Sequence, residues 1–175
     1  AHLHGQVWNA ADLARALGNN ESTVRRYLDW LTQLYMVRQL QPWHQNLGKR
    51  QVKSPKVYFR DSGLLHALLG LATVRDLQGH PVAGASWEGF VVEQVAAQLP
   101  ADAQLSFYRT AVGAEIDLIV EHGARTVAVE VKFSSAPKPA RGFWQALRDL
   151  RIEQAYVVAP VARRYPLAEG VDVLP

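Results

Sequence analysis

The sequence predicts an α/β protein, in which a mixed sheet flanked by helices follows a small helical unit that carries a β-hairpin. Three observations lead to this class. The first 35 residues carry two helix-like patterns in close succession. The remaining patterns alternate between helix and strand, as expected for a layered α/β domain. Hydrophobic residues make up 49% of the 175 residues and charged residues 20%, which suits a packed core and excludes a disordered chain. We place the first domain at residues 1–62 and the second at residues 63–175.

Two helices are expected at the beginning of the chain. Asn9 is a suitable N-cap for a helix over residues 9–17, which the run Gly18-Asn19-Asn20 ends. A second helix begins at Glu21, and its buried face is predicted from apolar residues at helical spacing, namely Val24, Leu28, Leu31 and Leu34. Two helices joined by such a short turn are typical of a helix-turn-helix.

Two strands, at residues 36–40 and 56–59, flank a polar and basic stretch at residues 46–54. Together with the helices they predict a winged helix with a basic wing. In such a unit Arg25 and Arg26 would contact a DNA groove, and the wing residues Lys49, Arg50 and Lys53 would contact phosphates. The alternative is that this unit only connects domains or binds another protein.

Charge is distributed unevenly between the two predicted domains. Residues 1–62 contain nine Lys and Arg against four acidic residues, a balance of +5. Residues 63–175 contain ten against twelve, a balance of −2, so that the whole chain has a net charge of +3. A basic unit suits a nucleic-acid backbone, whereas an acidic one suits cations.

The second domain begins with a short apolar helix at residues 63–71 and a loop at residues 74–85. Ser86 is predicted to cap a helix that Pro100 ends. The remaining pattern predicts strands at 104–109, 115–121 and 125–133, a helix at 140–151, and strands at 154–159 and 171–174.

The second and third of these strands suit a hairpin with a two-residue turn at Gly123-Ala124. This register places Asp117 opposite Glu130, and Glu115 opposite Lys132. Because side chains alternate along a strand, all four are expected on one face. The other face would then be uniformly apolar and suited to a core, with Ile116, Leu118, Val129 and Val131.

Acidic side chains in the middle of apolar strands are costly unless a cation compensates them. The chain has no cysteine, so a metal site would depend on oxygen or imidazole ligands. Asp117 and Glu130 therefore predict a Mg²⁺ or Mn²⁺ site, and Lys132 could stabilise charge on a phosphate. The alternative is a plain ion pair between Glu115 and Lys132, with Asp117 and Glu130 facing solvent.

An ordered set of motifs resembles the restriction-endonuclease-like, PD-(D/E)xK superfamily: Trp87-Glu88-Gly89-Phe90-Val91-Val92-Glu93, Phe107-Tyr108-Arg109-Thr110, Gly113-Ala114-Glu115-Ile116-Asp117 and Val129-Glu130-Val131-Lys132. The resemblance implies a Mg²⁺-dependent nuclease. Metal would be held by Asp117, Glu130 and the helical acid Glu88, for which Glu93 is the rival. Lys132 would be catalytic, and Glu115 and Gln145 would support the site.

More narrowly, the chain resembles the C-terminal region of prokaryotic AAA-type ATPases, in which a winged helix and a nuclease-like domain follow the ATPase module. The chain has no G-x-x-x-x-G-K-[ST] run and starts at Ala1, so we expect an ATPase module outside it. In this setting the nuclease-like domain is either active or an inactive module for DNA binding or protein contacts.

The chain also lacks the run of about 18 apolar residues that a membrane helix needs, which predicts a cytoplasmic protein without membrane contact. His2 and His4 are predicted to be incidental.

Overall fold

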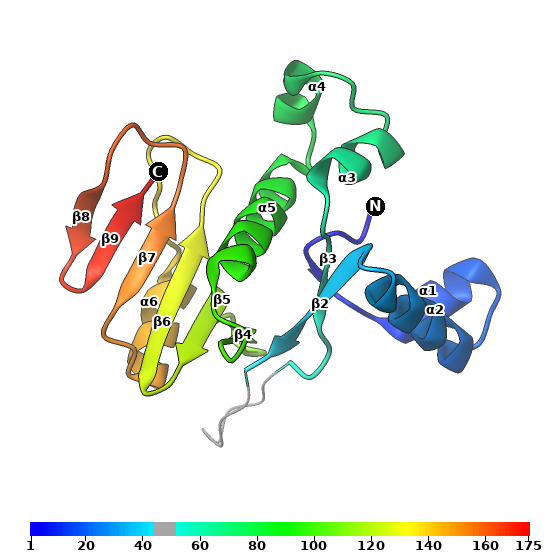
Figure 1. Ribbon diagram of the computed structural model, residues 1–175, viewed down its shortest axis with the longest axis horizontal. Coiled ribbons are helices and arrows are strands. Elements are labelled where there is room, and N and C mark those ends of the chain that lie inside the picture. Colours follow the sequence, from blue (N-terminus) through cyan, green and yellow to red (C-terminus); the bar gives the residue numbers. More distant parts are fainter. Residues whose placement is uncertain (44–51) are drawn as a thin grey trace.

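The computed structural model of the protein describes residues 1–43 and 52–175. Within these residues one nine-stranded sheet runs through the molecule, in the order β1-β3-β2-β4-β5-β6-β7-β9-β8 (Figure 1). Its strands are β1 (Gln6–Val7), β2 (Val37–Pro42), β3 (Lys56–Phe59), β4 (Gln104–Arg109), β5 (Glu115–His122), β6 (Arg125–Val131), β7 (Ala155–Val158), β8 (Tyr165–Ala168) and β9 (Val171–Leu174). The pairs β2–β4, β6–β7 and β7–β9 are parallel and the other pairs antiparallel. The predicted mixed sheet flanked by helices is confirmed.

The first two helices are α1 (Ala10–Leu17), which lies where it was predicted, and α2 (Glu21–Gln33), which begins at the predicted residue. The Asn9 side chain caps α1 by accepting hydrogen bonds from two backbone amides, and Gly18 ends it with a φ of 62°. The predicted apolar face of α2 is correct only for its first half. Val24 and Leu28 are buried, whereas Leu31 and Leu34 are 40% and 68% exposed. The eight-residue α1 is too short to cover the second half of the thirteen-residue α2.

The expected hairpin is present, because β2 and β3 pair in antiparallel fashion. Most of the predicted wing, including Lys49 and Arg50, lies outside the described residues. β2 also pairs with β4, so the strands that follow α2 belong to the same sheet as the rest of the molecule. The domain boundary after residue 62 stays a prediction.

Three helices follow β3, namely α3 (Ser62–Leu68), α4 (Val74–Gly79) and α5 (Ala83–Gln98). Two predictions were wrong here. The expected loop at residues 74–85 contains α4, which Thr73 and Asp76 stabilise with a capping box. Ser86 does not cap α5, because the helix begins one turn earlier. The Ser86 amide donates to the Val82 carbonyl, and the buried Ser86 hydroxyl bonds with Nε2 of His66 at 2.7 Å.

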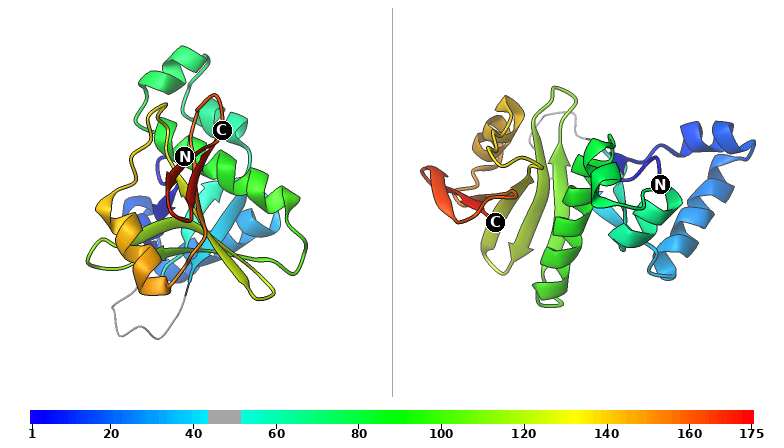
Figure 2. Two further views of the ribbon diagram at one scale, coloured as in Figure 1. Left: turned by 90° about the vertical axis from the view of Figure 1, so that its left-hand side faces the viewer. Right: turned by 90° about the horizontal axis from the view of Figure 1, so that it is seen from above.

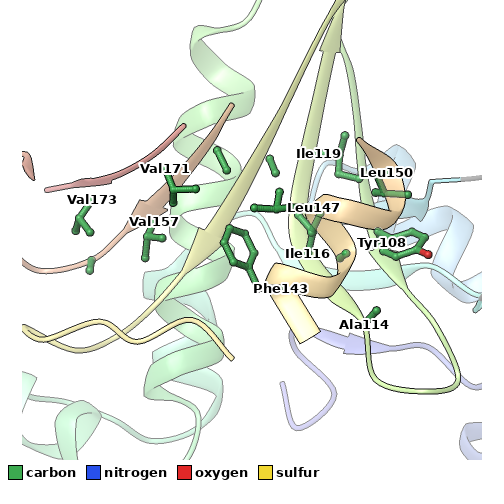
Figure 3. Close-up of a cluster of buried hydrophobic side chains, with 14 residues drawn as sticks. Tyr108, Ala114, Ile116, Ile119, Phe143, Leu147, Leu150, Val157, Val171 and Val173 are labelled. Carbon is green, nitrogen blue, oxygen red and sulfur yellow. The ribbon is translucent and has the colours of Figure 1, made fainter. Parts of the chain in front are cut away.

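The sheet is covered on opposite faces by α5 and α6 (Arg141–Leu150) (Figure 2). On the α6 side, Phe143, Leu147 and Leu150 pack among side chains of the central strands (Figure 3). On the α5 side, Val91 and Val92 belong to a second cluster with Leu118, Val129 and Val131. None of the helices in the described ranges has the length and apolar character that crossing a membrane requires.

The β5–β6 hairpin has the predicted register, with Glu121 opposite Thr126 and Leu118 opposite Val129. Gly123 has a φ of 59°, as its place in the turn requires. The prediction that Ile116 and Leu118 share one apolar face was wrong, because the pairing of β4 with β5 shifts by one residue between Ser106 and Tyr108. The extra residue in β5 forms a β-bulge that inverts the alternation. Ile116 consequently packs on the α6 side, and Leu118 on the α5 side.

Candidate functional site

A cavity of about 720 Å³ opens where β5 begins and β6 ends, with α5 and the start of α6 beside it. We call this cavity the acidic pocket. Seven charged side chains line it: the acids Glu88, Glu115, Asp117 and Glu130 and the bases Lys56, Arg109 and Lys132. The structure therefore brings together five predicted site residues, Glu88, Glu115, Asp117, Glu130 and Lys132, and adds two bases that the sequence did not indicate.

Asp117 lies at the β-bulge of β5 and is buried. Its Oδ2 accepts a hydrogen bond of 3.0 Å from the Val131 amide of β6, which fixes the carboxylate between the two strands. Its Oδ1 lies 3.5 Å from Nζ of Lys56. The strands thus present Asp117 to the pocket in one orientation.

Glu130 and Lys132 form an ion pair across one side of the pocket. Lys132 Nζ donates to Glu130 Oε1 at 2.6 Å. Glu130 Oε2 is buried and has no hydrogen-bond partner among the described residues. Burial, reinforced by the charge of Asp117, raises the pKa of Glu130 to about 8, although Lys132 opposes the shift. The pocket accordingly holds a carboxylate oxygen that lacks a positive partner.

Lys56, at the beginning of β3, is the main residue that sequence reasoning missed. It is only 3% exposed, and its Nζ lies 3.0 Å from Glu88, 3.1 Å from Glu115 and 3.5 Å from Asp117. Burial alone would lower the pKa of Lys56, but the three carboxylates raise it above its ordinary value. The available signal was a lysine that opens the otherwise apolar strand Lys56–Phe59, where a charge is costly without a partner.

Glu88 projects from α5 and is held by two side chains of β3. Its Oε1 accepts hydrogen bonds from Lys56 Nζ and from the Tyr58 hydroxyl, the latter at 2.5 Å. Burial, with Asp117 as the second cause, raises the pKa of Glu88. Burial and the Glu88 charge also raise the pKa of Tyr58, so its hydroxyl stays a donor.

Glu93, the rival of Glu88 on α5, is not among the residues that line the acidic pocket. Its carboxylate is held by the guanidinium groups of Arg38 and Arg60, with the Arg60 Nε at 2.9 Å. These pairs join α5 to β2 and to the end of β3, so Glu93 has a structural partner set of its own.

The remaining predicted residues lie elsewhere or are paired differently. Glu115 contacts Lys56 and Arg109 rather than the expected Lys132, because β5 and β6 no longer pair at this end of the hairpin. Gln145 does not reach the acidic pocket. Its side-chain amide donates a hydrogen bond to Asp149, one turn along α6. Gln145 instead lines a separate surface depression beside α6.

Among the predicted DNA-binding residues that the structure describes, Arg25, Arg26 and Lys53 are not part of the acidic pocket lining. Arg25 is exposed on α2 and lies 3.5 Å from Glu21, and the Arg26 guanidinium lies 5.4 Å from the centre of the Trp30 ring. Lys53 is exposed just before β3.

The pocket can be tested for its fit to a divalent cation. No group of three acidic or histidine side chains in the described ranges is placed to hold a metal ion, and Lys56 already contacts Glu88 and Glu115. Asp117 and Glu130 remain, and the latter has an unpartnered oxygen. Mg²⁺ commonly binds one or two carboxylates and keeps several waters, so these two residues fit it. With all of them ionised, the four acids and three bases of the pocket leave one negative charge to balance.

Two family profiles match separate parts of the chain. The profile of a family described as "Domain of unknown function (DUF4143)" matches residues 83–175. The chain belongs to this family. A second profile, "Domain of unknown function (DUF8612)", matches residues 1–75.

Two curated relatives are the uncharacterized proteins Rv2008c of Mycobacterium tuberculosis and Mb2031c of Mycobacterium bovis. Each is 48% identical over all 175 residues of this chain. The chain spans 40% of the length of these relatives. No solved structure matches the chain.

Proposed function

We propose that the acidic pocket binds a nucleic-acid phosphodiester and hydrolyses it with a Mg²⁺ or Mn²⁺ ion held by Asp117 and Glu130. The observation that carries this proposal is the buried, unpartnered Oε2 of Glu130 beside Asp117. A divalent ion would supply the missing positive charge and Lewis-acid stabilisation of the phosphoryl oxygens.

Lys132 is the residue best placed to act on the substrate. It is tied to Glu130 by one hydrogen bond, and an ammonium group has three donors, so it can also contact a phosphate oxygen. Its ammonium stays charged: burial lowers the pKa of Lys132, but Glu130 more than reverses this and raises it overall. A fixed positive charge at this position stabilises the negative charge that builds up during phosphoryl transfer.

The start of α6 supports anion binding at the same pocket. Gly142 and the N-cap residue Ala140 line the cavity, and the helix has no side-chain cap, so its first amides point to the cavity region without a competing side chain. The absence of a side chain at Gly142 is necessary there, because a Cβ would lie 2.2 Å from the Gly113 carbonyl oxygen. Arg109 lines the same cavity and adds a base at its more exposed side.

This proposal includes a finer fold assignment. The acidic half would be a PD-(D/E)xK, restriction-endonuclease-like domain, and the helices α1 and α2 with β2 and β3 would be a winged helix that contacts DNA through Arg25, Arg26 and Lys53. The protein would act beside an ATPase module in the cytoplasm. The greater length of the two mycobacterial relatives leaves room for such a module in them.

The proposal is tested by incubating the purified chain with linear, branched and single-stranded DNA and with RNA, in the presence of Mg²⁺ or Mn²⁺. Cleavage is expected with the wild type and should fall at least 100-fold in Asp117→Asn and Lys132→Met, in line with loss of a charge-stabilising group. Lys138→Met changes an exposed lysine outside the pocket and should leave cleavage unchanged. Cleavage that survives both pocket substitutions would contradict the proposal.

A second candidate is a non-catalytic module for DNA binding or protein contacts. It is favoured by Lys56, which already contacts three of the four acids. The exposed Trp30, Leu34 and Tyr35 at the end of α2 offer an apolar surface for a partner protein. This candidate predicts no cleavage and no dependence of DNA binding on divalent ions.

A further inference from the structure

Lys56 stands where a cation that bridges Glu88, Glu115 and Asp117 would lie. Its Nζ contacts one oxygen of each carboxylate within 3.5 Å. The ammonium also lies over the aromatic face of Phe107, at 5.5 Å from the centre of the ring. At 3% exposure the side chain is enclosed, so it cannot leave this position without a movement of β3 or α5.

The lysine and the acids come from different parts of the chain. Lys56 lies in the region matched by the first family profile, residues 1–75. Glu88, Glu115, Asp117 and Glu130 all lie in the second, residues 83–175. The N-terminal part therefore supplies a charge that the C-terminal part lacks, and the electrostatics of the pocket depend on both.

A divalent ion and an ammonium cannot occupy this side of the pocket together. Mg²⁺ requires oxygen ligands at about 2.0–2.1 Å, which demands the space that Nζ fills. The two cations would also repel each other within a buried site. The other side differs, because Lys132 pairs with Glu130 Oε1 and leaves Oε2 without a partner among the described residues.

We propose that Lys56 is a built-in cation that excludes divalent ions from Glu88 and Glu115, so that the pocket accepts one such ion, at Asp117 and Glu130. This inference rests on the proposed function for the ion at Asp117 and Glu130. It makes Lys56 the residue that sets the number of bound metal ions, because its ammonium group takes the place of a second ion.

The direct test is a titration of the full chain with Mn²⁺, in which calorimetry and electron paramagnetic resonance measure the number of bound ions. The wild type is expected to bind one ion, and Lys56→Met to bind two. Lys56→Arg keeps the charge and should bind one. Lys138→Met is the control for loss of a lysine charge at an exposed site, and it should bind one ion with wild-type affinity. A Lys56→Met protein that binds Mn²⁺ exactly as the wild type does would overturn the inference.

Lys56→Met leaves three acids without their shared partner and is expected to destabilise the fold, so a second measurement keeps Lys56 in place. In the wild-type background, Glu88→Gln and Glu115→Gln should change the Mn²⁺ dissociation constant less than threefold, because Lys56 already engages these carboxylates. Glu130→Gln should weaken binding at least tenfold. Equal weakening by all three substitutions would refute the exclusion.

The failure of this inference and the failure of the proposed function give different results. If the wild type binds no Mn²⁺ but Lys56→Met does, Lys56 excludes the ion and the proposed metal site at Asp117 and Glu130 is wrong. If the wild type and Lys56→Met each bind one ion, and Glu130→Gln abolishes it, the proposed site stands and the exclusion is wrong.

Discussion

The two sides of the acidic pocket each place a lysine against carboxylates, but they do so by different means. Lys56 reaches three acids from a distant strand and is 3% exposed. Lys132, the residue after β6, pairs with Glu130 two residues before it, and its side chain is 30% exposed. On the Lys56 side one lysine contacts an oxygen of each of three carboxylates, whereas on the Lys132 side a buried oxygen of Glu130 has no partner among the described residues. We expect the first arrangement to stabilise the fold, and we propose that the second receives the ion.

The largest expected difference between the two sides is in stability. Lys56→Met should lower the free energy of unfolding by about 3–5 kcal/mol, because it removes one partner of a buried ionic cluster. Lys132→Met should cost about 1 kcal/mol or less, since the side chain is partly solvated. Urea denaturation at neutral pH measures both. Adding Glu88→Gln to Lys56→Met removes one uncompensated charge and should restore part of the loss. Equal losses of unfolding free energy in Lys56→Met and Lys132→Met would contradict the claim that Lys56 has the larger structural role.

The Lys56 side also depends on the N-terminal segment, which packs against β3 and so helps to hold Lys56 in place. His4 is buried, with Nε2 at 3.0 Å from the Ala85 carbonyl of α5 and Nδ1 accepting from the Phe59 amide of β3. Burial lowers the pKa of His4 from 6.5 to about 4. The prediction from sequence that His4 is incidental was wrong, because a short N-terminal segment folds back onto α5 at Gly89, where a Cβ would lie 2.6 Å from the ring.

This lowered pKa makes stability depend on pH. Above about pH 6.5 the histidine is neutral in both states and its contribution is fully present. Between pH 6.5 and about 4 only the unfolded chain binds the proton, so roughly 3 kcal/mol is lost. Between pH 6.5 and 4, the free energy of unfolding should therefore change less with pH in His4→Gln than in the wild type, which urea denaturation at several pH values measures. His2→Gln, at an exposed neighbour, is the control and should follow the wild type.

A pH dependence of opposite sign is expected on the Lys132 side. The pKa of Glu130 is raised to about 8, so its contribution to stability is full below pH 4.5 and is lost as the pH rises to about 8. Glu130→Gln should therefore raise the melting temperature above pH 8, by about 2–4 °C for each kcal/mol gained, and should match the wild type near pH 4. Thermal denaturation with and without Mn²⁺ checks this, since Mn²⁺ should stabilise only the wild type. A lower melting temperature for Glu130→Gln at pH 9 would show that the charge is compensated.

The sequence predicted the parts of the site that depend on local pattern. The turn at Gly123 set the register of β5 and β6, and this register brought Asp117 and Glu130 to the same end of the hairpin. The cap at Asn9 and the stop at Gly18 defined α1 for similar reasons. These features need only a few consecutive residues.

The features that could not be predicted depend on contacts between distant residues. Lys56 is 32 residues from Glu88, and only the packing of β3 beside α5 brings them together. The β-bulge in β5 arises from its pairing with β4, which no period in the sequence of β5 encodes. Gln145 was expected at the pocket from its helix alone, but its direction is set by the packing of Phe143 and Leu147 on the sheet.

The measurement that tests the central claim most directly is anomalous diffraction from a crystal of the wild-type protein soaked in Mn²⁺. We expect a single peak between the carboxylates of Asp117 and Glu130, with Lys56 still in contact with Glu88. A peak among Glu88, Glu115 and Asp117 with Lys56 displaced, or no peak in the acidic pocket at a Mn²⁺ concentration that saturates binding in solution, would contradict the account.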